Sequence, residues 1–262
     1  MNKKILSFWK DKCVVVTGAS SGLGRAVVEA LAPFQIRFCL LSRRESDMLE
    51  LALRLKDSGS TFWIKTCDVR KKAQVYSAIR DFHRQTGRID AVWVNSGIGG
   101  SSAFSEWQWD RIHDIIDTNL VGAIYTIIAC LEFMVDQKSG VVIGIGSATA
   151  MRAIPTRGVY SMTKIGLEYM IESLAIELPD IQFTMIHPGF VDTPMVNKRK
   201  NTVWIVQPDR AAKMMIRAVT KGKTFYIFPF RMSLLYRIVK LLPKPLYRKL
   251  AKNVIYTRKK KA

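Results

Sequence analysis

The chain reads Val14-Val15-Val16-Thr17-Gly18-Ala19-Ser20-Ser21-Gly22-Leu23-Gly24 near its N-terminus, and this stretch decides the fold. A short β-branched segment enters a glycine-rich turn, and the segment Arg25 to Ala32 that follows predicts a helix. Glycines in such a unit let the backbone approach a pyrophosphate, which the free N–H groups and dipole of the helix N-terminus attract. A plain turn between strand and helix remains the alternative, because a glycine-rich turn alone is weak evidence.

The rest of the chain alternates β-branched runs with longer amphipathic segments, which predicts a parallel sheet covered by helices. The predicted strands are Val14–Val16, Phe38–Leu41, Phe62–Lys65, Ala91–Val94, Val141–Ile145, Phe183–Ile186 and Phe225–Phe228. The predicted helices include Arg25–Ala32, Ala73–Gln85, Arg111–Val135, Tyr160–Glu177 and Arg210–Thr220. We therefore expect an α/β, doubly wound, seven-stranded Rossmann fold, with ligands at the carboxyl ends of the strands.

Length and charge divide the chain into two parts. With 262 residues and 48% hydrophobic residues, the chain is expected to bury one core. The net charge is +20, but residues 198–262 contain 19 Lys or Arg and one acid, so the preceding 197 residues carry 22 basic and 20 acidic groups, or +2. We predict a catalytic domain over residues 1–230 and a basic extension over 231–262.

Cysteine usage and the apolar runs favour an intracellular, soluble body. The four cysteines are far apart and lie mostly in apolar runs, which predicts reduced, buried thiols in a cytoplasmic protein. The N-terminal segment holds four lysines around a brief apolar stretch, so no secretory signal is expected. The run Leu120–Val135 is interrupted by Glu132 and is shorter than the ~20 residues that span a bilayer, so it is interpreted as a buried helix.

The three histidines, His83, His113 and His187, have no acidic or cysteine partner at ligand spacing. We therefore predict no metal site.

The end of the second predicted strand reads Ser42-Arg43-Arg44. A carboxylate here would accept the 2′-hydroxyl of NAD, whereas arginines can pair with the 2′-phosphate of NADP. The sequence therefore favours NADP(H) over NAD(H). A solvated basic turn is the alternative.

Tyr160 and Lys164 are four residues apart in a predicted helix, so their side chains share one face. The ordinary pKa of a tyrosine is near ~10, and a neighbouring ammonium stabilises the phenolate. We expect Lys164 to lower the pKa of Tyr160. Such a pair also occurs by chance on helix surfaces.

Taken together, these motifs resemble the short-chain dehydrogenase/reductase family over roughly residues 10–225. Its TGxxxGxG and YxxxK patterns are present, together with Asn95-Ser96-Gly97, Asn119, Ser147 thirteen residues before Tyr160, and Pro188-Gly189-Phe190-Val191-Asp192-Thr193. The chain departs from the family's pattern at Val94 and Ser96, and at Gly146 where a second serine is frequent.

The resemblance implies that Tyr160 exchanges a proton with the substrate oxygen while hydride moves to or from the nicotinamide. It implies further that Ser147 holds the substrate oxygen, Lys164 binds the nicotinamide ribose, and Asn119 positions a water that relays protons to Lys164. The cofactor residues that it implies, with those from the turn and the second strand, are Gly18, Ser20, Ser21, Gly22, Leu23, Gly24, Ser42, Arg43, Arg44, Asp68, Val69, Asn95, Gly97, Tyr160, Lys164, Pro188, Gly189, Val191 and Thr193. The resemblance also implies a homodimer or tetramer formed through the long helices.

Residues 194–206 include Met195, Val196, Trp204, Ile205 and Val206, at the place where the family has a mobile segment over the substrate. An apolar lid favours a lipophilic substrate, with a sterol or keto-lipid as a hypothesis. A loop packed on the body by its own tryptophan is the alternative.

Beyond the last strand, residues 231–242 and 246–256 predict two basic amphipathic helices joined by Pro243-Lys244-Pro245. From Lys223 onward there are 12 basic residues and no acid, which favours an anionic membrane surface contacted through residues 231–261. Docking on the enzyme's own body or on a partner subunit, with Arg258 to Lys261 as a solvated end, is the alternative.

Other function classes remain open. The same charge would serve nucleic-acid binding, which we do not favour, and steep salt dependence would reveal it. A cofactor-sensing protein on the same scaffold would typically lack one of the active residues, and an epimerase would have a longer chain.

Overall fold

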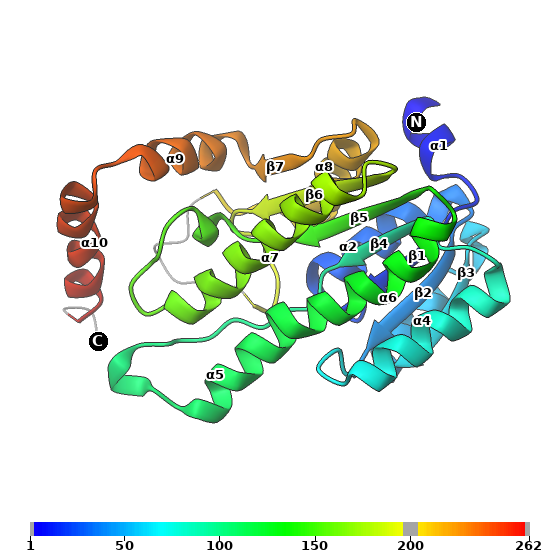
Figure 1. The fold of residues 1–262 in the computed structure, drawn as a ribbon, viewed down its shortest axis with the longest axis horizontal. Helices are drawn as coiled ribbons and strands as arrows, with labels where there is room; N and C mark the ends of the chain where they lie inside the picture. The colour runs from blue at the N-terminus through cyan, green and yellow to red at the C-terminus, as the bar shows by residue number, and fades with distance from the viewer. Residues whose placement is uncertain (1–2, 196–203, 260–262) are drawn as a thin grey trace.

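The computed structural model describes residues 3–195 and 204–259. Seven strands form one parallel sheet, as the sequence predicted (Figure 1). Their order across the sheet is β3-β2-β1-β4-β5-β6-β7. The strands are β1 Cys13–Thr17, β2 Arg37–Ser42, β3 Thr61–Thr66, β4 Ala91–Val94, β5 Gly140–Ile145, β6 Ile181–Pro188 and β7 Phe225–Phe228. The order reverses between β1 and β4, and the glycine-rich turn follows β1, so the turn lies at the switch point of the sheet.

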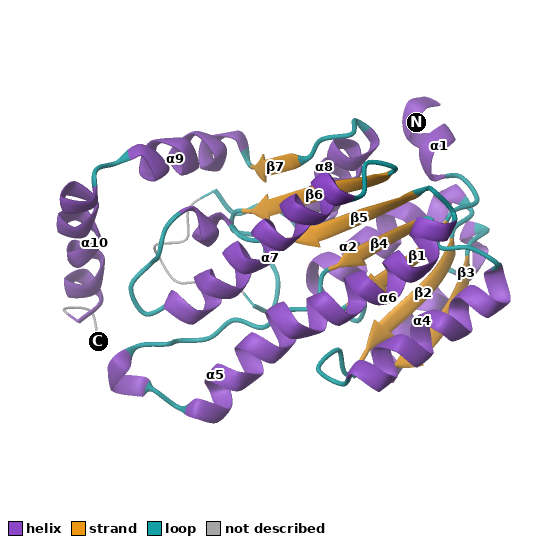
Figure 2. Cartoon of the chain, in the orientation of Figure 1, coloured by secondary structure: helices purple, strands orange, loops and turns teal. Residues whose placement is uncertain are grey.

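Helices cover both faces of the sheet (Figure 2). Successive strand side chains point to opposite faces, so Val14 and Val16 pack with the first helix layer and Val15 with the second. The first layer contains α2 Gly22–Leu31, α3 Glu45–Arg54 and α8 Pro208–Thr220. The second contains α4 Lys72–Thr86, α6 Gly122–Asp136 and α7 Gly158–Glu177. Apolar helix residues cover both faces of the sheet, so the central strands are apolar on both faces and appear in the sequence as continuous apolar runs.

An additional helix, α1 Lys3–Trp9, precedes the sheet and was not predicted from the sequence. Trp9 is fully buried, stacks on Trp93 with 6.1 Å between ring centroids, and donates from Nε1 to Thr220 Oγ1 at 2.9 Å. Its partners lie 84 and 211 residues away in sequence. Local pattern therefore could not reveal this anchor.

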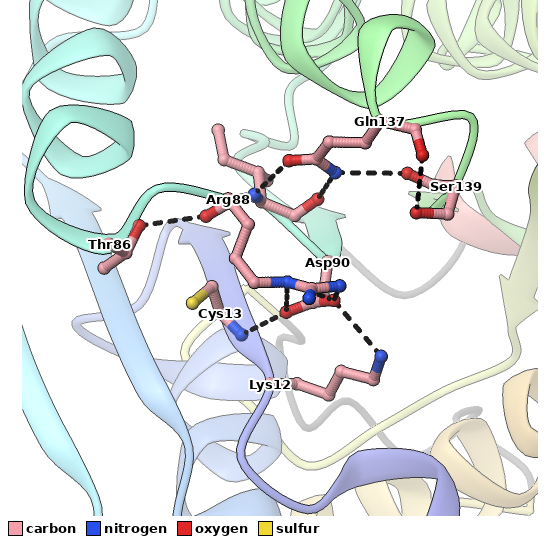
Figure 3. Close-up of polar contacts among 8 residues, drawn as sticks. Lys12, Cys13, Thr86, Arg88, Asp90, Gln137 and Ser139 are labelled. Carbon is pink, nitrogen blue, oxygen red and sulfur yellow. Dashed lines mark hydrogen bonds and ion pairs between the residues drawn. The ribbon is translucent and has the colours of Figure 1, made fainter.

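A buried carboxylate, Asp90, ties the amino ends of β1 and β4 together. Its polar contacts are drawn in Figure 3. Asp90 accepts hydrogen bonds from the Cys13 amide at 2.8 Å, from Lys12 Nζ at 3.1 Å and from the Arg88 guanidinium at 2.6 Å. At the same end of the sheet, Gln137 Oε1 accepts a hydrogen bond from the Ile89 amide and Gln137 Nε2 donates one to the Ile89 carbonyl. This polar clamp satisfies backbone groups that the sheet leaves open.

The predicted helix Arg111–Val135 contains a π-helical turn in the structure. It consists of α5 Trp109–Ile116, a π-helical turn Asp117–Val121 and then α6. Of the described helices, only this continuous stretch, Trp109–Asp136, is long and apolar enough to span a bilayer, and half of its most apolar window is buried in the protein. The packing of α6 against α4 and the sheet agrees with its interpretation as a buried helix.

The C-terminal extension forms the two predicted helices, α9 Phe230–Leu241 and α10 Lys244–Lys259. They lie at the end of the long axis toward which the strands point (Figure 1). Helix α9 packs on β7 and on the short turn Ala148–Met151 through Met232 and Tyr236. Arg152 donates from Nη1 to the carbonyls of Val239 and Leu242 and so caps the C-terminal end of α9.

Candidate active site

The glycine-rich turn is held closely against the end of β4. Gly18 has φ +66°, a conformation that favours glycine, and a Cβ on Gly24 would lie 2.3 Å from the Gly18 carbonyl oxygen. Asn95 Nδ2 donates to the carbonyls of Thr17 and Gly18 at 3.2 and 3.4 Å. Thr17 Oγ1 accepts from the backbone amides of Asn95 and Ser96. Asn95, one of the predicted cofactor-binding residues, therefore holds the glycine-rich turn against the end of β4 through its hydrogen bonds.

The N-terminus of α2, which follows this turn, has the character of an anion site. No side chain caps this helix end, and its first turn contains no acidic residue. The amides of Gly22, Leu23 and Gly24 belong to the first helical turn, where N–H groups lack helical partners and the dipole favours negative charge. A pyrophosphate fits such an end, so these residues would hold the diphosphate of a dinucleotide.

The end of β2 lies beside the same turn. Ser42 Oγ donates to Ser20 Oγ at 2.8 Å, and Arg44 Nη2 donates to the hydroxyls of Ser20 and Ser21 at 2.8 and 2.7 Å. Arg44 also forms an ion pair with Asp47 at 2.7 Å. Arg43 is exposed, and its charge contributes to lowering the pKa of Asp68. The structure therefore brings Ser42 and Arg44 to the turn, while Arg43 acts on Asp68 only through its charge.

Asp68 and Val69 follow β3, at the same edge of the sheet. The Arg70 guanidinium, bonded to both carboxylate oxygens, holds the pKa of Asp68 below its usual range. Val69 is buried against Gly122, where a Cβ would lie 2.8 Å from Val69 Cγ2. Asp68 is thus held in place by a neighbouring ion pair, and Val69 contacts the start of α6.

Three of the four predicted catalytic side chains surround the carboxyl end of β5. Tyr160 and Lys164 share one face of α7, with Lys164 Nζ 5.9 Å from the centre of the Tyr160 ring. The Ser147 and Tyr160 side chains are hydrogen-bonded to each other. Lys164 is buried, and its Nζ donates to the carbonyl of Ile145 at 2.9 Å.

The electrostatics of this group differ from the sequence expectation. Burial raises the pKa of Tyr160, outweighing the hydrogen bond from Ser147 and the charge of Arg157, which both lower it. The net shift of this pKa is therefore upward, opposite to the lowering expected from the sequence, because burial of the phenol outweighs the groups that lower it. Burial lowers the pKa of Lys164 to about 8. A phenol that keeps its proton at neutral pH can serve as a proton donor.

Asn119, the fourth predicted residue, is fully buried in the π-helical turn. Its Oδ1 accepts from the Ile98 amide at 2.7 Å and its Nδ2 donates to the Ile98 carbonyl at 3.0 Å. A Cβ on Gly97 would lie 3.3 Å from Asn119 Oδ1 and 3.4 Å from Lys164 Nζ. The turn therefore brings the loop after β4 against Lys164, which agrees with the frequent occurrence of π-bulges at functional sites.

The segment after β6 returns to the glycine-rich turn. The Gly189 amide donates to the Phe228 carbonyl at 2.8 Å, and Thr193 lies within van der Waals reach of Gly22. Val191 forms an isolated parallel bridge with Val206. Met195, Trp204 and Ile205 are partly exposed at the two ends of the predicted lid. Val196 and the rest of residues 196–203 lie outside the described residues.

Sequence reasoning missed two polar groups behind Ser147. His187 Nδ1 lies 2.8 Å from the Ser147 carbonyl oxygen, and His187 Nε2 lies 3.0 Å from Glu168 Oε2. The signal was present in part, since Glu168 follows Lys164 by four residues, as Lys164 follows Tyr160. The position of His187 depends on the sheet, which no local spacing reveals.

Comparisons with known proteins agree with this geometry. The family model described as short chain dehydrogenase matches residues 12–204. An uncharacterized oxidoreductase of Myxococcus xanthus is 31% identical over 239 residues, covering 90% of this chain and 94% of that protein. Another, of Staphylococcus saprophyticus, is 34% identical over 190 residues, covering 71% and 81%.

Solved structures show the same fold. An alcohol dehydrogenase of the archaeon Thermococcus sibiricus, complexed with 5-hydroxy-NADP, has a TM-score of 0.76 at 26% identity, covering 84% of this chain and 95% of that one. A short chain dehydrogenase/reductase of Burkholderia phymatum in complex with NAD has a TM-score of 0.80 at 18% identity, covering 87% and 92%. With the family match spanning most of the chain and the motif residues gathered at one edge of the sheet, this protein belongs to the short-chain dehydrogenase/reductase family of oxidoreductases.

Proposed function

We propose that the protein is an NADP(H)-dependent oxidoreductase that interconverts a carbonyl and an alcohol. The observation that carries this proposal is the joint placement of Ser147, Tyr160 and Lys164 at the carboxyl end of β5, beside the glycine-rich turn. A bound nicotinamide supplies or accepts the hydride. Tyr160 donates the proton to the carbonyl oxygen, Ser147 holds that oxygen, and Lys164 binds the nicotinamide ribose hydroxyls. Asn119 keeps the loop at Gly97 against Lys164 and positions the relay water.

The cofactor preference rests on Arg44 and Arg43. The Arg44 guanidinium already lies on the hydroxyls of Ser20 and Ser21, beside the end of β2. A 2′-phosphate would offer it a charge-assisted partner in place of neutral hydroxyls, and such bonds are roughly twice as strong. In the part of the chain that the structure describes, β2 ends without a carboxylate that could accept the 2′-hydroxyl of NAD, since Ser42 stands there.

The test titrates the purified protein with NADPH and NADH separately by fluorescence, with Arg43→Ala/Arg44→Ala as the variant. Arg80→Ala is a matched control, since Arg80 is exposed on α4, the helix that follows Asp68. We expect a preference for NADPH that the double variant loses and the control keeps. Equal affinity for both cofactors would overturn the NADP assignment, and no binding of either would overturn the oxidoreductase proposal.

A lipophilic substrate is supported by apolar side chains around the site. Met195, Trp204 and Ile205 are partly exposed at the ends of the lid. Phe104 and Trp109 are exposed before and at the start of α5. Helix α5 begins toward the end of the long axis at which α9 and α10 lie (Figure 1). Exposed apolar side chains near a site favour an apolar ligand. Sterols and keto-lipids are the substrate classes to screen.

We propose further that residues 1–230 form the catalytic part and residues 231–262 bind an anionic membrane surface. One face of α9 is docked through Met232 and Tyr236, and the opposite face exposes Phe230, Leu234, Ile238 and Leu241. Arg231, Arg237 and Lys240 flank this stripe. On α10, Leu246 and Leu250 are exposed among basic residues. Docking on the body uses only one face of α9, which leaves its exposed apolar face for the proposed membrane contact.

Vesicle flotation tests the membrane proposal, with phosphatidylcholine vesicles that contain or lack phosphatidylserine. The wild type is expected to float with the anionic vesicles, and Leu234→Glu/Ile238→Glu is expected to lose this binding. Leu49→Glu/Leu53→Glu is the control, since both residues are exposed on α3. Binding to duplex DNA in preference to vesicles, with steep salt dependence, would overturn the membrane proposal. A cytoplasmic location at the membrane surface is consistent with four free, buried cysteines.

A homodimer or tetramer through the long helices completes the proposal. Met162, Tyr169 and Ile176 are exposed at seven-residue intervals along α7, which forms one apolar stripe on its outer side. Light scattering tests this assembly by measuring the molar mass of the wild type, expected to be a dimer or tetramer, and of Tyr169→Glu, expected to be smaller. A monomeric wild type would refute this assembly.

A further inference from the structure

We propose that His187 and Glu168 form a buried positioning pair for the catalytic serine, with His187 holding the Ser147 backbone and Glu168 orienting His187. The proposal rests on the role of Ser147 in the proposed function. Neither residue was among the sequence-predicted site residues, and neither touches the reacting atoms in the mechanism above. Four observations carry the assignment.

The contact between His187 and Ser147 fixes the direction of the ring. His187 Nδ1 lies 2.8 Å from the Ser147 carbonyl oxygen and 3.3 Å from the Ser147 amide nitrogen. The carbonyl can only accept, so the shorter contact requires a proton on Nδ1 and leaves that nitrogen unable to accept from the amide. His187 therefore donates to Ser147 and binds the backbone that carries the catalytic hydroxyl.

The second ring nitrogen faces a carboxylate. His187 Nε2 lies 3.0 Å from Glu168 Oε2, within ion-pair distance, although neither atom meets hydrogen-bond geometry. His187 is fully buried and Glu168 nearly so. A carboxylate beside one ring nitrogen fixes the orientation of the imidazole, as outer carboxylates do for functional histidines. Glu168 lies on α7 one turn beyond Lys164, so the same helix carries Tyr160, Lys164 and Glu168.

The backbone leaves room for this ring only because residue 146 is glycine. A Cβ on Gly146 would lie 2.8 Å from both Cε1 and Nδ1 of His187. A serine at this position, which is frequent in the family, would press against the imidazole. The departure at Gly146 and the presence of His187 are therefore complementary features of this chain.

Aromatic rings from two other elements seal the pair. The His187 ring lies 4.9 Å from Phe225 on β7 and 6.0 Å from Tyr236 on α9, measured between centroids. The hydroxyl of Tyr236 is buried with no hydrogen-bond partner among the described residues. Enclosure strengthens electrostatic contacts and holds the side chains in one arrangement. The first helix of the extension thus forms a wall of the positioning site.

The proposed pair affects the reaction by positioning the Ser147 hydroxyl, which is hydrogen-bonded to Tyr160. Ser147 donates a hydrogen bond that lowers the pKa of Tyr160, against the burial that raises it. If His187 holds Ser147 in place, loss of His187 must weaken this bond without touching Tyr160. A residue that only packs the core would not change the titration of Tyr160 in this way.

The first experiment follows Tyr160 directly in the full-length protein, by NMR of tyrosine labelled at Cζ, with Tyr160→Phe to assign the signal. We expect His187→Leu and Ser147→Ala each to raise the pH at which Tyr160 titrates, and the double variant to show no further rise. His187→Asn is expected to restore much of the wild-type titration, since its amide can donate where Nδ1 does. Thr184→Val is the control, because Thr184 is a fully buried polar residue on β6.

The second experiment measures turnover of a ketone with NADPH. His187→Leu and Glu168→Gln are expected to lower kcat by about tenfold or more, within the ~10²-fold loss typical of a 1 Å misplacement. NADPH affinity is expected to stay unchanged, and His187→Leu is expected to cost nothing further in the Ser147→Ala background.

An unchanged Tyr160 titration in His187→Leu, or effects that add to those of Ser147→Ala, would overturn the positioning role. If His187→Leu does not fold, Glu168→Gln and His187→Asn decide the question by the same readouts. If no ketone is turned over by the wild type, the proposed function fails, while the NMR titration still decides whether His187 positions Ser147.

Discussion

Replacing Lys164 by Met tests how much stability the site gives up to keep a buried ammonium. Lys164 is buried on all sides, and burial lowers its pKa from 10.5 to about 8. The folded chain therefore holds this proton less tightly than the unfolded chain does. A shift of this size corresponds to roughly 3 kcal/mol against folding at pH 7.

The substitution also removes one contact. Lys164 Nζ donates to the Ile145 carbonyl at 2.9 Å, and leaving that carbonyl without a donor costs about 1–2 kcal/mol. Met has a similar length and no charge, so the net expectation is that Lys164→Met is about 1–2 kcal/mol more stable than the wild type at pH 7. Turnover is expected to be lost in the same variant.

The pH dependence gives the prediction its sign. Between pH 8 and 10.5 the folded chain releases the Lys164 proton while the unfolded chain still binds it, so wild-type stability rises through this window relative to the variant. Urea unfolding at pH 7 and pH 10 measures the change, which we expect to be roughly 2 kcal/mol. Lys65→Met, on the exposed face of edge strand β3, is the control and should show no such change. A Lys164→Met variant less stable than wild type at pH 7, with a pH-independent difference, would refute the reasoning.

Three further predictions concern the glycine-rich turn, the polar clamp at Asp90 and helix α9. Gly24→Ala is expected to weaken NADPH binding at least tenfold in fluorescence titration, as its Cβ would meet the Gly18 carbonyl at 2.3 Å; unchanged affinity would contradict the close approach. Asp90→Ala is expected to lower the free energy of unfolding by about 2 kcal/mol in urea, since the Cys13 amide loses its acceptor; unaltered NADPH affinity at low temperature would confirm that this clamp lies away from the site. Tyr236→Phe is expected to raise the free energy of unfolding by about 1 kcal/mol, because a buried hydroxyl without a partner is removed; a loss of stability in urea would reveal a partner for it.

The sequence carried most of the fold. Each predicted strand is present, and the central strands β1 and β4 were the clearest, because a strand buried on both faces must be apolar at almost every position and that property is local. The glycine-rich turn was equally readable, since Gly18 needs a positive φ and Gly24 a close backbone approach. The expected roles of Tyr160 and Lys164 came from resemblance and their shared helix face from spacing, and in the structure both lie on α7 with Lys164 Nζ 5.9 Å from the centre of the Tyr160 ring.

Features that depend on distant partners could not be predicted. Helix α1 is short, and its anchor Trp9 is buried only because Trp93 and Thr220 meet it from elsewhere in the chain. The π-helical turn at Asn119 breaks a run whose apolar pattern predicts continuous helix. The direction in which the Tyr160 pKa is shifted could not be predicted either, because desolvation depends on everything packed around the phenol and not on the spacing to Lys164.

By itself the sequence determined which segments are strands and helices, where the glycine-rich turn predicted to bind a diphosphate lies, and where the positive charge gathers, since periodicity, glycine placement and charge are properties of neighbouring residues. Only the tertiary structure decided which groups share the site's interior. His187, Glu168 and Tyr236 come from β6, α7 and α9, and their meeting behind Ser147 depends on the order of strands in the sheet and on the packing of α9 upon it. Burial then decided the electrostatics, because the cost of a charge depends on the solvent removed around it, which no local pattern of residues encodes.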